Sequence, residues 1–268
     1  MLKNVTIGQY YPVDSIIHRL DPRTKIVGTL LYIVSLFLFR TFSGFIVVGT
    51  VFAGILILSK VPFRYLLRGL KPILFILVFT MICNFFLADG EVLWQWKFLK
   101  LTKEGIQRGF FMGIRLALLV FGTSIMTYTT TPNSLTDGLE RLMSPLRVIH
   151  FPVHELAMMM SIALRFIPIL AEEAQRISKA QMARGADMES GGLIRRAKAM
   201  VPILIPLLIS SFRRAFDLAT AMEARCYHGG KGRTKMKPLR YGLRDLFGYL
   251  FLACYMTTII LLRMFRNI

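Results

Sequence analysis

Residues 41–59 read TFSGFIVVGTVFAGILILS, a run of nineteen residues without a charged side chain. A helix that crosses the hydrocarbon core of a bilayer needs about 17 to 25 predominantly apolar residues. The composition of the whole chain also indicates a membrane protein, because 54% of its 268 residues are hydrophobic, 18% are charged, and the mean hydropathy is +0.55. The sequence therefore predicts an integral membrane protein and excludes an ordinary soluble domain.

Four further runs have a similar composition. They are residues 72–88, the apolar first part of 116–136, residues 246–262, and residues 26–39. The last of these is short, but the arginine that follows it can extend its charge to the membrane surface. We therefore expect an all-α membrane protein with about five transmembrane helices, four of them within residues 26–130 and the last within residues 243–268.

Basic residues predict the orientation of these spans. The segment 60–71 carries four basic residues and no acidic one, whereas residues 89–104 mix both signs. Because basic loops remain on the cytoplasmic side, we expect segment 60–71 there, together with the N-terminal segment 1–25 and the region 131–242. This assignment places Arg263 and Arg266, at the end of the last span, on the outer side, which opposes the rule. An even number of spans therefore stays open. Charged residues precede the first apolar run, and we therefore expect no cleavable signal.

Cysteines and histidines give no sign of a metal centre. Cys83, Cys226 and Cys254 form no spaced framework, so we expect neither a disulfide nor a structural metal. A proline separates His150 from His154, and no third ligand accompanies them. The spacings typical of phosphate loops, serine hydrolases and zinc peptidases are absent from the sequence. We therefore expect no catalytic residue and no cofactor in this chain.

Two long amphipathic segments occupy much of the region 131–242. Apolar residues recur every three or four positions over about 153–185 and again over about 193–226, with charged residues on the other sides. Each segment predicts a helix of about 45 to 50 Å, which internal prolines would bend. Their charges exclude the hydrocarbon core, so we expect the two helices to lie along the cytoplasmic membrane surface or to cross one another beneath it. The two apolar stripes either pack on each other for part of their length or remain available to a partner.

Matched motifs end the two segments. Ala183-Arg184-Gly185 closes the first, and Ala224-Arg225-Cys226 closes the second forty-one residues later, with further glycines after both. An arginine in a last helical turn is favoured by the helix dipole, and its planar guanidinium remains able to bind a carboxylate. Simple capping explains one such arginine. The repetition favours a pair of docking sites on a partner protein.

The strong positive charge fits a membrane protein with an acidic partner. The formal net charge is +19, and the basic residues cluster beside the spans and in the region 131–242. Anionic lipid of the inner leaflet and an acidic protein surface account for this distribution. Because no aromatic-interleaved basic stripe or zinc finger is present, we do not expect nucleic-acid binding.

Three motifs recur together in one known family. They are HRLDPRTK at 18–25, MARGADMESGG at 182–192 and AMEARCYHGGK at 221–231. With them, essentially the whole chain resembles the transmembrane T component of energy-coupling factor transporters, the family of EcfT and CbiQ-like proteins. The form of the motifs is most similar to that of modules shared among several substrate-binding subunits. Cys226 stands where the family pattern has glycine.

The resemblance implies a non-catalytic subunit of a bacterial cell-membrane importer for vitamins or related micronutrients. It would join two ATP-binding-cassette ATPases, which bind the ATP and magnesium, to a small membrane-embedded substrate-binding S component, exchangeable in a shared module. Arg184 would dock one ATPase and Arg225 the other, each with its two flanking motif residues. We expect contacts with the S component from residues of the apolar stripes and from a methionine beside them. These are Met158, Met159, Met160, Phe166, Leu204 and Leu208.

Two other classes of protein stay open. A membrane enzyme acting on lipid or isoprenoid substrates would need a carboxylate cluster, for which the acidic residues between 172 and 189 are the best candidates, although they fit a solvated face better. A permease with its own substrate path would need polar lining, for which Asn84 and residues 127–131 are candidates. Purification together with two ATPases and a small hydrophobic protein would favour the coupling subunit over both.

Overall fold

The computed structural model describes residues 10–39, 41–87, 91–96, 99–186, 192–229, 236 and 238–266. These residues are almost entirely helical, which confirms the predicted all-α class. They divide into two compact units. The bundle unit comprises the described residues up to 141 together with those from 239 onward, and the crossed-helix unit comprises the described residues of 142–238.

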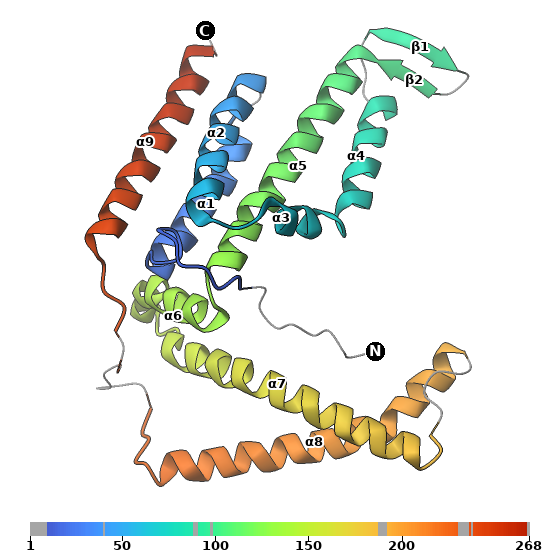
Figure 1. The fold of residues 1–268 in the computed structure, drawn as a ribbon, viewed down its shortest axis with the longest axis vertical. Helices are drawn as coiled ribbons and strands as arrows, with labels where there is room; N and C mark the ends of the chain where they lie inside the picture. The colour runs from blue at the N-terminus through green and yellow to red at the C-terminus, as the bar shows by residue number, and fades with distance from the viewer. Residues whose placement is uncertain are drawn as a thin grey trace. The chain divides into compact units, whose positions relative to one another are not determined.

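The bundle unit is organised around one long helix, α5 (Lys103–Thr129) (Figure 1). Four other helices of the unit, α1, α2, α3 and α4, pack against it, and α9 packs against α1. Two shorter helices, α3 and α6, complete the unit. The remaining helices are α1 (Pro22–Leu38), α2 (Phe42–Ser59), α3 (Phe63–Leu70), α4 (Leu74–Leu87), α6 (Pro132–Leu142) and α9 (Leu243–Arg266).

A short β-hairpin is the one feature that departs from the all-α expectation in the described part of the chain. β1 (Val92–Trp96) and β2 (Leu99–Thr102) pair antiparallel between α4 and α5. The side chain of Thr102 then caps α5 by accepting a hydrogen bond of 3.1 Å from the N–H of Gly105. The hairpin therefore leads directly into the central helix.

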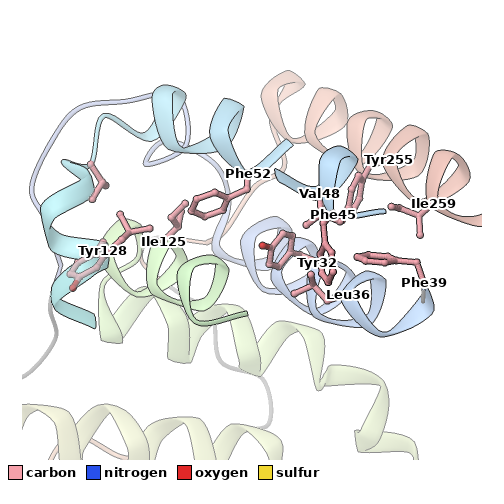
Figure 2. Close-up of a cluster of buried hydrophobic side chains, with 12 residues drawn as sticks. Tyr32, Leu36, Phe39, Phe45, Val48, Phe52, Ile125, Tyr128, Tyr255 and Ile259 are labelled. Carbon is pink, nitrogen blue, oxygen red and sulfur yellow. The ribbon is translucent and has the colours of Figure 1, made fainter. Parts of the chain in front are cut away.

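The core of the bundle unit lies between α1, α2, α5 and α9. Leu36 and Val48 are fully buried, and Ile259 is 1% exposed. Figure 2 shows these side chains gathered with the rings of the surrounding aromatic residues. Tyr32 lies so close to α5 that a Cβ atom added at Gly122 would be 2.2 Å from its ring. The glycine therefore lets α1 approach the backbone of α5.

The fourth predicted span begins earlier than the sequence suggests. We expected its apolar part from residue 116, whereas α5 already begins at Lys103 and includes Arg115. Nη2 of Arg115 donates a hydrogen bond of 2.9 Å to the carbonyl oxygen of Phe39, which follows the last residue of α1. Its guanidinium also lies 4.7 Å from the ring centroid of Phe111. Arg115 therefore belongs to the packing of α1 on α5.

Five described helices are long and apolar enough to cross a membrane: α2, α5, α7 (Val153–Ala183), α8 (Leu193–Glu223) and α9. The pair α3 and α4, bent by 64°, raises the number to six if it forms one broken span. The five helices agree in number with the five predicted spans, but two of them are not the predicted ones. The predicted spans in α1 and α4 lie in shorter helices of 17 and 14 residues, whereas α7 and α8 also meet the criteria of length and composition.

The crossed-helix unit begins with a short 3-10 helix, Ser144–Ile149, and consists mainly of α7 and α8. Each of these helices has 31 residues, which corresponds to about 46 Å. Pro168 lies inside α7, and Pro202 and Pro206 lie inside α8, yet both helices continue through them. The two helices cross, and their C-terminal ends point in opposite directions (Figure 1).

Candidate functional site

The crossing of α7 and α8 is fixed by a small polar cluster. Glu173 of α7 accepts one hydrogen bond from Ser210 Oγ at 2.5 Å and another from Arg214 Nη2 at 2.9 Å. The ion pair is partly shielded from solvent, because the side chains of Arg214 and Glu173 are 40% and 23% exposed. Charge-assisted bonds of this kind have a defined geometry. They therefore set which turn of α7 meets which turn of α8.

The two motif arginines are placed equally with respect to this cluster. Arg184 follows Glu173 by eleven residues, and Arg225 follows Arg214 by eleven residues. At 1.5 Å per residue, each arginine lies about 16 Å along its own helix from the ion pair. The unit therefore presents two arms of equal length, which leave the crossing in opposite directions (Figure 1).

The C-terminal end of α7 is a Schellman motif. The N–H of Gly185 donates to the carbonyl oxygen of Met182 at 3.0 Å, and the N–H of Ala186 donates to that of Gln181 at 3.0 Å. Gly185 adopts a φ of 87°, the left-handed conformation that this motif requires. Arg184 is therefore the last residue before the chain turns away from the helix.

The C-terminal end of α8 repeats this pattern bond for bond. The N–H of Cys226 donates to the carbonyl oxygen of Glu223 at 2.9 Å, and the N–H of Tyr227 donates to that of Met222 at 3.1 Å. Cys226 takes the left-handed position with a φ of 55°. Cysteine thus adopts the backbone conformation that glycine adopts in α7, at the cost of steric strain that glycine avoids. Arg225 accordingly occupies the same place as Arg184.

The structure brings the six predicted motif residues to two separate helix ends. Ala183, Arg184 and Gly185 are exposed on α7, and Ala224, Arg225 and Cys226 are exposed on α8. The ion pairs found among the described residues involve neither arginine. Each guanidinium is therefore presented to solvent at the end of an arm, where it can bind an acidic partner surface.

Much of the predicted apolar stripe of α8 is exposed. Leu204 and Leu208 are 58% and 57% exposed, and Phe212 and Phe216 follow them on the same side and are exposed as well. The partly buried positions of α8 lie on another face, which includes Ser210 and Arg214. The interpretation that the stripes pack on each other is therefore wrong for most of this helix, because the face that meets α7 is a different one, on which Ile203 and Leu207 accompany the polar residues.

The other residues predicted to contact the S component lie on α7. Met159 and Met160 are 54% and 51% exposed, whereas Met158 and Phe166 are partly buried. We call the exposed residues Met159, Met160, Leu204, Leu208, Phe212 and Phe216 the apolar surface of the crossed-helix unit. An exposed apolar surface of this kind is typical of a site that contacts another protein or a membrane.

The N-terminal motif at 18–25 has a structural role in the bundle unit. Asp21 caps α1, because its Oδ1 atom accepts a hydrogen bond of 2.9 Å from the N–H of Arg23. The guanidinium of Arg23 bonds back to Asp21 at 2.9 Å and lies 3.8 Å from the ring centroid of Tyr241. Burial acts to raise the pKa of the Asp21 carboxyl, but the hydrogen bonds from Arg23 outweigh it and hold the pKa below its usual value.

Asp245 of α9 is a residue that sequence reasoning missed. It is 5% exposed, and its Oδ1 atom accepts hydrogen bonds from the N–H of Asp21 at 2.8 Å and from Thr24 Oγ1 at 3.2 Å. Its Oδ2 atom accepts another from the N–H of Gly242 at 2.9 Å. Asp245 therefore holds the start of α1 against the start of α9. No local sequence pattern marks it, because its partner Asp21 is 224 positions away.

The residues considered for other functions are used otherwise in the described structure. Glu173 is bound in the α7–α8 cluster, Glu172 is exposed, and the acidic residues at 187 and 189 lie outside the described residues. Asn84 and Thr127 donate to carbonyl oxygens of their own helices. Among the described residues, no group of three or more histidine, cysteine, aspartate or glutamate side chains is arranged to hold a metal ion.

Comparison with known proteins gives a consistent result over nearly the whole chain. The family model described as CbiQ, cobalt transport protein, matches residues 14–236. A protein from Ruminiclostridium cellulolyticum named energy-coupling factor transporter transmembrane protein EcfT is 51% identical over 262 residues, which cover 98% of both chains. Proteins of the same name from Clostridium kluyveri and Bacillus subtilis are 54% and 45% identical over 254 and 246 residues. These matches cover 93% and 91% of this chain and 93% of each relative.

Proposed function

Since the chain belongs to the CbiQ family of transport proteins, we propose that it is the transmembrane energy-coupling subunit of an energy-coupling factor importer. It is a membrane protein and a transporter component without catalytic chemistry of its own. In this proposal, two partner ATPases bind ATP and magnesium, and a small membrane-embedded S component binds the transported vitamin or related micronutrient. This chain joins the ATPases to the S component.

The two arms of the crossed-helix unit are the proposed docking elements for the ATPases. The observation that carries this proposal is that Arg184 and Arg225 occupy the same position in two equivalent helix ends, each eleven residues after a member of the α7–α8 ion pair. Two equivalent binding elements suit two related partners. An exposed arginine next to a backbone turn can form a paired hydrogen bond with a carboxylate of the partner, which fixes orientation as well as attraction.

The apolar surface of the crossed-helix unit is the proposed contact for the S component. Its exposed methionine, leucine and phenylalanine side chains would be covered when a hydrophobic partner binds. Methionine adapts to partners of different shape, which suits a subunit shared among several S components. The proposed contact residues Met158 and Phe166 adjoin this surface and are partly buried.

We place α7 and α8 on the cytoplasmic side, although their length and apolarity would also allow them to span the bilayer. Charged residues occur along both helices, and Glu172, Glu173 and Arg176 lie within the first turns after the midpoint of α7. Each charged residue at the centre of a spanning helix costs about 2.5 to 3.5 kcal/mol. A position along the membrane surface avoids this cost and keeps both arginines accessible to the ATPases.

Coupling follows from this arrangement. When ATP binding and hydrolysis move the two ATPases, the two docked arms move with them, and the angle between α7 and α8 changes at their crossing. The apolar surface moves as part of the same helices. The S component that contacts it is therefore shifted in the membrane, so that its substrate reaches the cytoplasm.

Reconstitution tests this function directly. The chain would be placed in proteoliposomes with the two ATPases and the S components of its organism, and radiolabelled vitamins and cobalt would be offered one at a time. We expect uptake of at least one of these compounds that requires both ATP and this chain. Uptake that proceeds equally without the ATPases would support a permease with its own path and contradict the proposal.

A further inference from the structure

A cavity of about 620 Å³ lies within the bundle unit. Its wall is formed by α1, α2, α5, α9 and the segment before α1. Each of the four helices contributes a glycine to it, namely Gly28, Gly54, Gly122 and Gly248. A volume between about 300 and 1,000 Å³ is typical of sites that bind small molecules. The cavity is therefore large enough for part of a ligand, and at Gly54 the absence of a side chain leaves open space in it.

The cavity is elongated along the helices. Its lining extends from Thr24 to Tyr32 on α1 and from Arg244 to Tyr255 on α9. At 1.5 Å per residue, these stretches correspond to about 12 Å and about 16 Å. Three of the four helices that form it are candidates to cross the membrane. The long axis of the cavity therefore follows the direction of the acyl chains of a bilayer.

Positive charge is concentrated at one end of this otherwise largely apolar cavity. Lys25 and Arg244 line the end where α1 and α9 begin. Nζ of Lys25 donates to the carbonyl oxygens of His18 at 3.0 Å and Thr129 at 2.8 Å, both of which are uncharged. The ion pairs among the described residues include neither of the two cations. An ammonium group has three donors, so Lys25 retains one for an anion.

The carboxylates nearest to this end are bound elsewhere. Asp14 is paired with Arg19, Asp21 bonds to Arg23, and Asp245 bonds to Thr24 and to backbone N–H groups. The basic end of the cavity is therefore complementary to an external anion, while its remaining wall is complementary to a hydrocarbon chain. A molecule that combines both chemistries is a phospholipid with a negatively charged headgroup.

We propose that the cavity binds an anionic phospholipid, with one acyl chain between α1, α2, α5 and α9 and its phosphate next to Lys25 and Arg244. Burial of the acyl chain in the cavity removes apolar surface from contact with solvent or loosely packed lipid. The phosphate supplies a counter-charge in direct contact with the two basic residues, which take part in no ion pair recorded among the described residues. This site lies wholly within the bundle unit, and the proposal rests on membrane residence alone, not on docking of the ATPases.

Two glycines of α2 provide a matched test of the acyl-chain position. A Cβ atom added at Gly54 or at Gly49 meets no other atom within 4 Å, but Gly54 lines the cavity and Gly49 does not. Gly54→Leu is therefore expected to fill the cavity, whereas Gly49→Leu makes the same change on the same helix outside it. The assembled complex would be purified in micelles containing equal amounts of phosphatidylglycerol and phosphatidylcholine, and its retained lipids would be measured by native mass spectrometry.

We expect the wild type and Gly49→Leu to retain phosphatidylglycerol and Gly54→Leu to lose its occupancy by about tenfold or more. Phosphatidylglycerol should also raise the thermal unfolding midpoint of the wild type and of Gly49→Leu, but not that of Gly54→Leu. Equal retention by both leucine variants, or retention of detergent alone by the wild type, would overturn the proposal.

A change at Arg244, which is exposed, tests the headgroup separately. It remains informative even if leucine at position 54 disturbs the packing of the helices. Arg244→Gln should reduce the preference for phosphatidylglycerol over phosphatidylcholine by about two- to fivefold, the effect of one charge near the surface. Arg64→Gln, an exposed arginine of α3 that does not line the cavity, is the control and should leave the preference unchanged. An unchanged preference in Arg244→Gln would refute the assignment of an anionic headgroup.

Discussion

Glu173 of α7 accepts a hydrogen bond of 2.9 Å from Arg214 of α8, and each of these two residues precedes a motif arginine by eleven positions. The ion pair is therefore the point from which both arms extend equally. A change at this point alters the directions of Arg184 and Arg225 together. The crossing, which touches no partner in this proposal, is accordingly as important for coupling as the arginines themselves.

Reversal of one charge at the crossing should uncouple the two arms. Glu173→Arg places two like charges in contact, whereas the double change Glu173→Arg with Arg214→Glu restores an opposite pair. We expect the single variant to broaden the distance distribution between spin labels at the exposed positions Lys179 and Glu223, and the double variant to recover it. Electron paramagnetic resonance on the assembled complex measures this. Identical distributions in both variants would show that the ion pair does not set the crossing.

The left-handed cysteine at the end of α8 predicts a stabilising substitution. Cys226 has a φ of 55°, and relief of this strain by Cys226→Gly should stabilise the end of α8 by about 1 kcal/mol. Gly185→Ala should destabilise the end of α7 by a similar amount, because the φ of Gly185 is 87°. Gly192→Ala, at a position without positive φ, is the control. Hydrogen exchange of residues 222–227 and 181–186 reports both effects, and faster exchange in Cys226→Gly would contradict the reasoning.

Loss of Asp245 should destabilise the bundle unit. Asp245→Ala removes a buried acceptor and leaves the N–H of Asp21 and the hydroxyl of Thr24 without that partner. We expect a loss of about 2 to 3 kcal/mol, measured as a lower thermal unfolding midpoint of the purified complex. Asp14→Ala removes an aspartate whose ion pair with Arg19 is exposed, and it should have little effect. Equal midpoints for the two variants would contradict the structural role of Asp245.

Arg115 should contribute to stability through α1. Its guanidinium donates to the carbonyl oxygen of Phe39, so Arg115→Ala should cost about 1.5 to 3 kcal/mol, the usual range for a hydrogen bond to a charged group. Arg108→Ala removes an exposed arginine of the same helix and should be nearly neutral. Thermal unfolding of both variants in detergent makes the comparison. An unaffected Arg115→Ala variant would mean that the bond is replaced by water or lipid.

The long helices and their matched ends were predictable because their signals are local. The recurrence of apolar residues every three or four positions predicted α7 and α8, and glycine after Arg184 indicated where a helix stops. The equivalent turn at Cys226 was less visible, since cysteine rarely adopts positive φ. Only the hydrogen bonds show that the two ends have the same geometry.

Other features depend on contacts between residues far apart in the sequence, which no local pattern reveals. The apolar stripe of α8 predicted which face is hydrophobic, but the face that meets α7 carries Ser210 and Arg214 instead. Arg115 suggested a limit to the fourth span, although its bond to Phe39 allows α5 to continue through it. The hairpin before α5 was not predicted either.

The most direct test of the proposed coupling is the amount of each ATPase that is purified with this chain. Arg184→Ala with Arg225→Ala would be compared with Arg176→Ala plus Arg213→Ala, which removes two exposed arginines from the same helices outside the motifs. We expect quantitative mass spectrometry to find both ATPases with the wild type and the control. It should find neither with the motif variant at an equal level of the chain in the membrane, because both docking sites have lost their charge. Recovery of both ATPases at wild-type amounts with the motif variant would contradict the account.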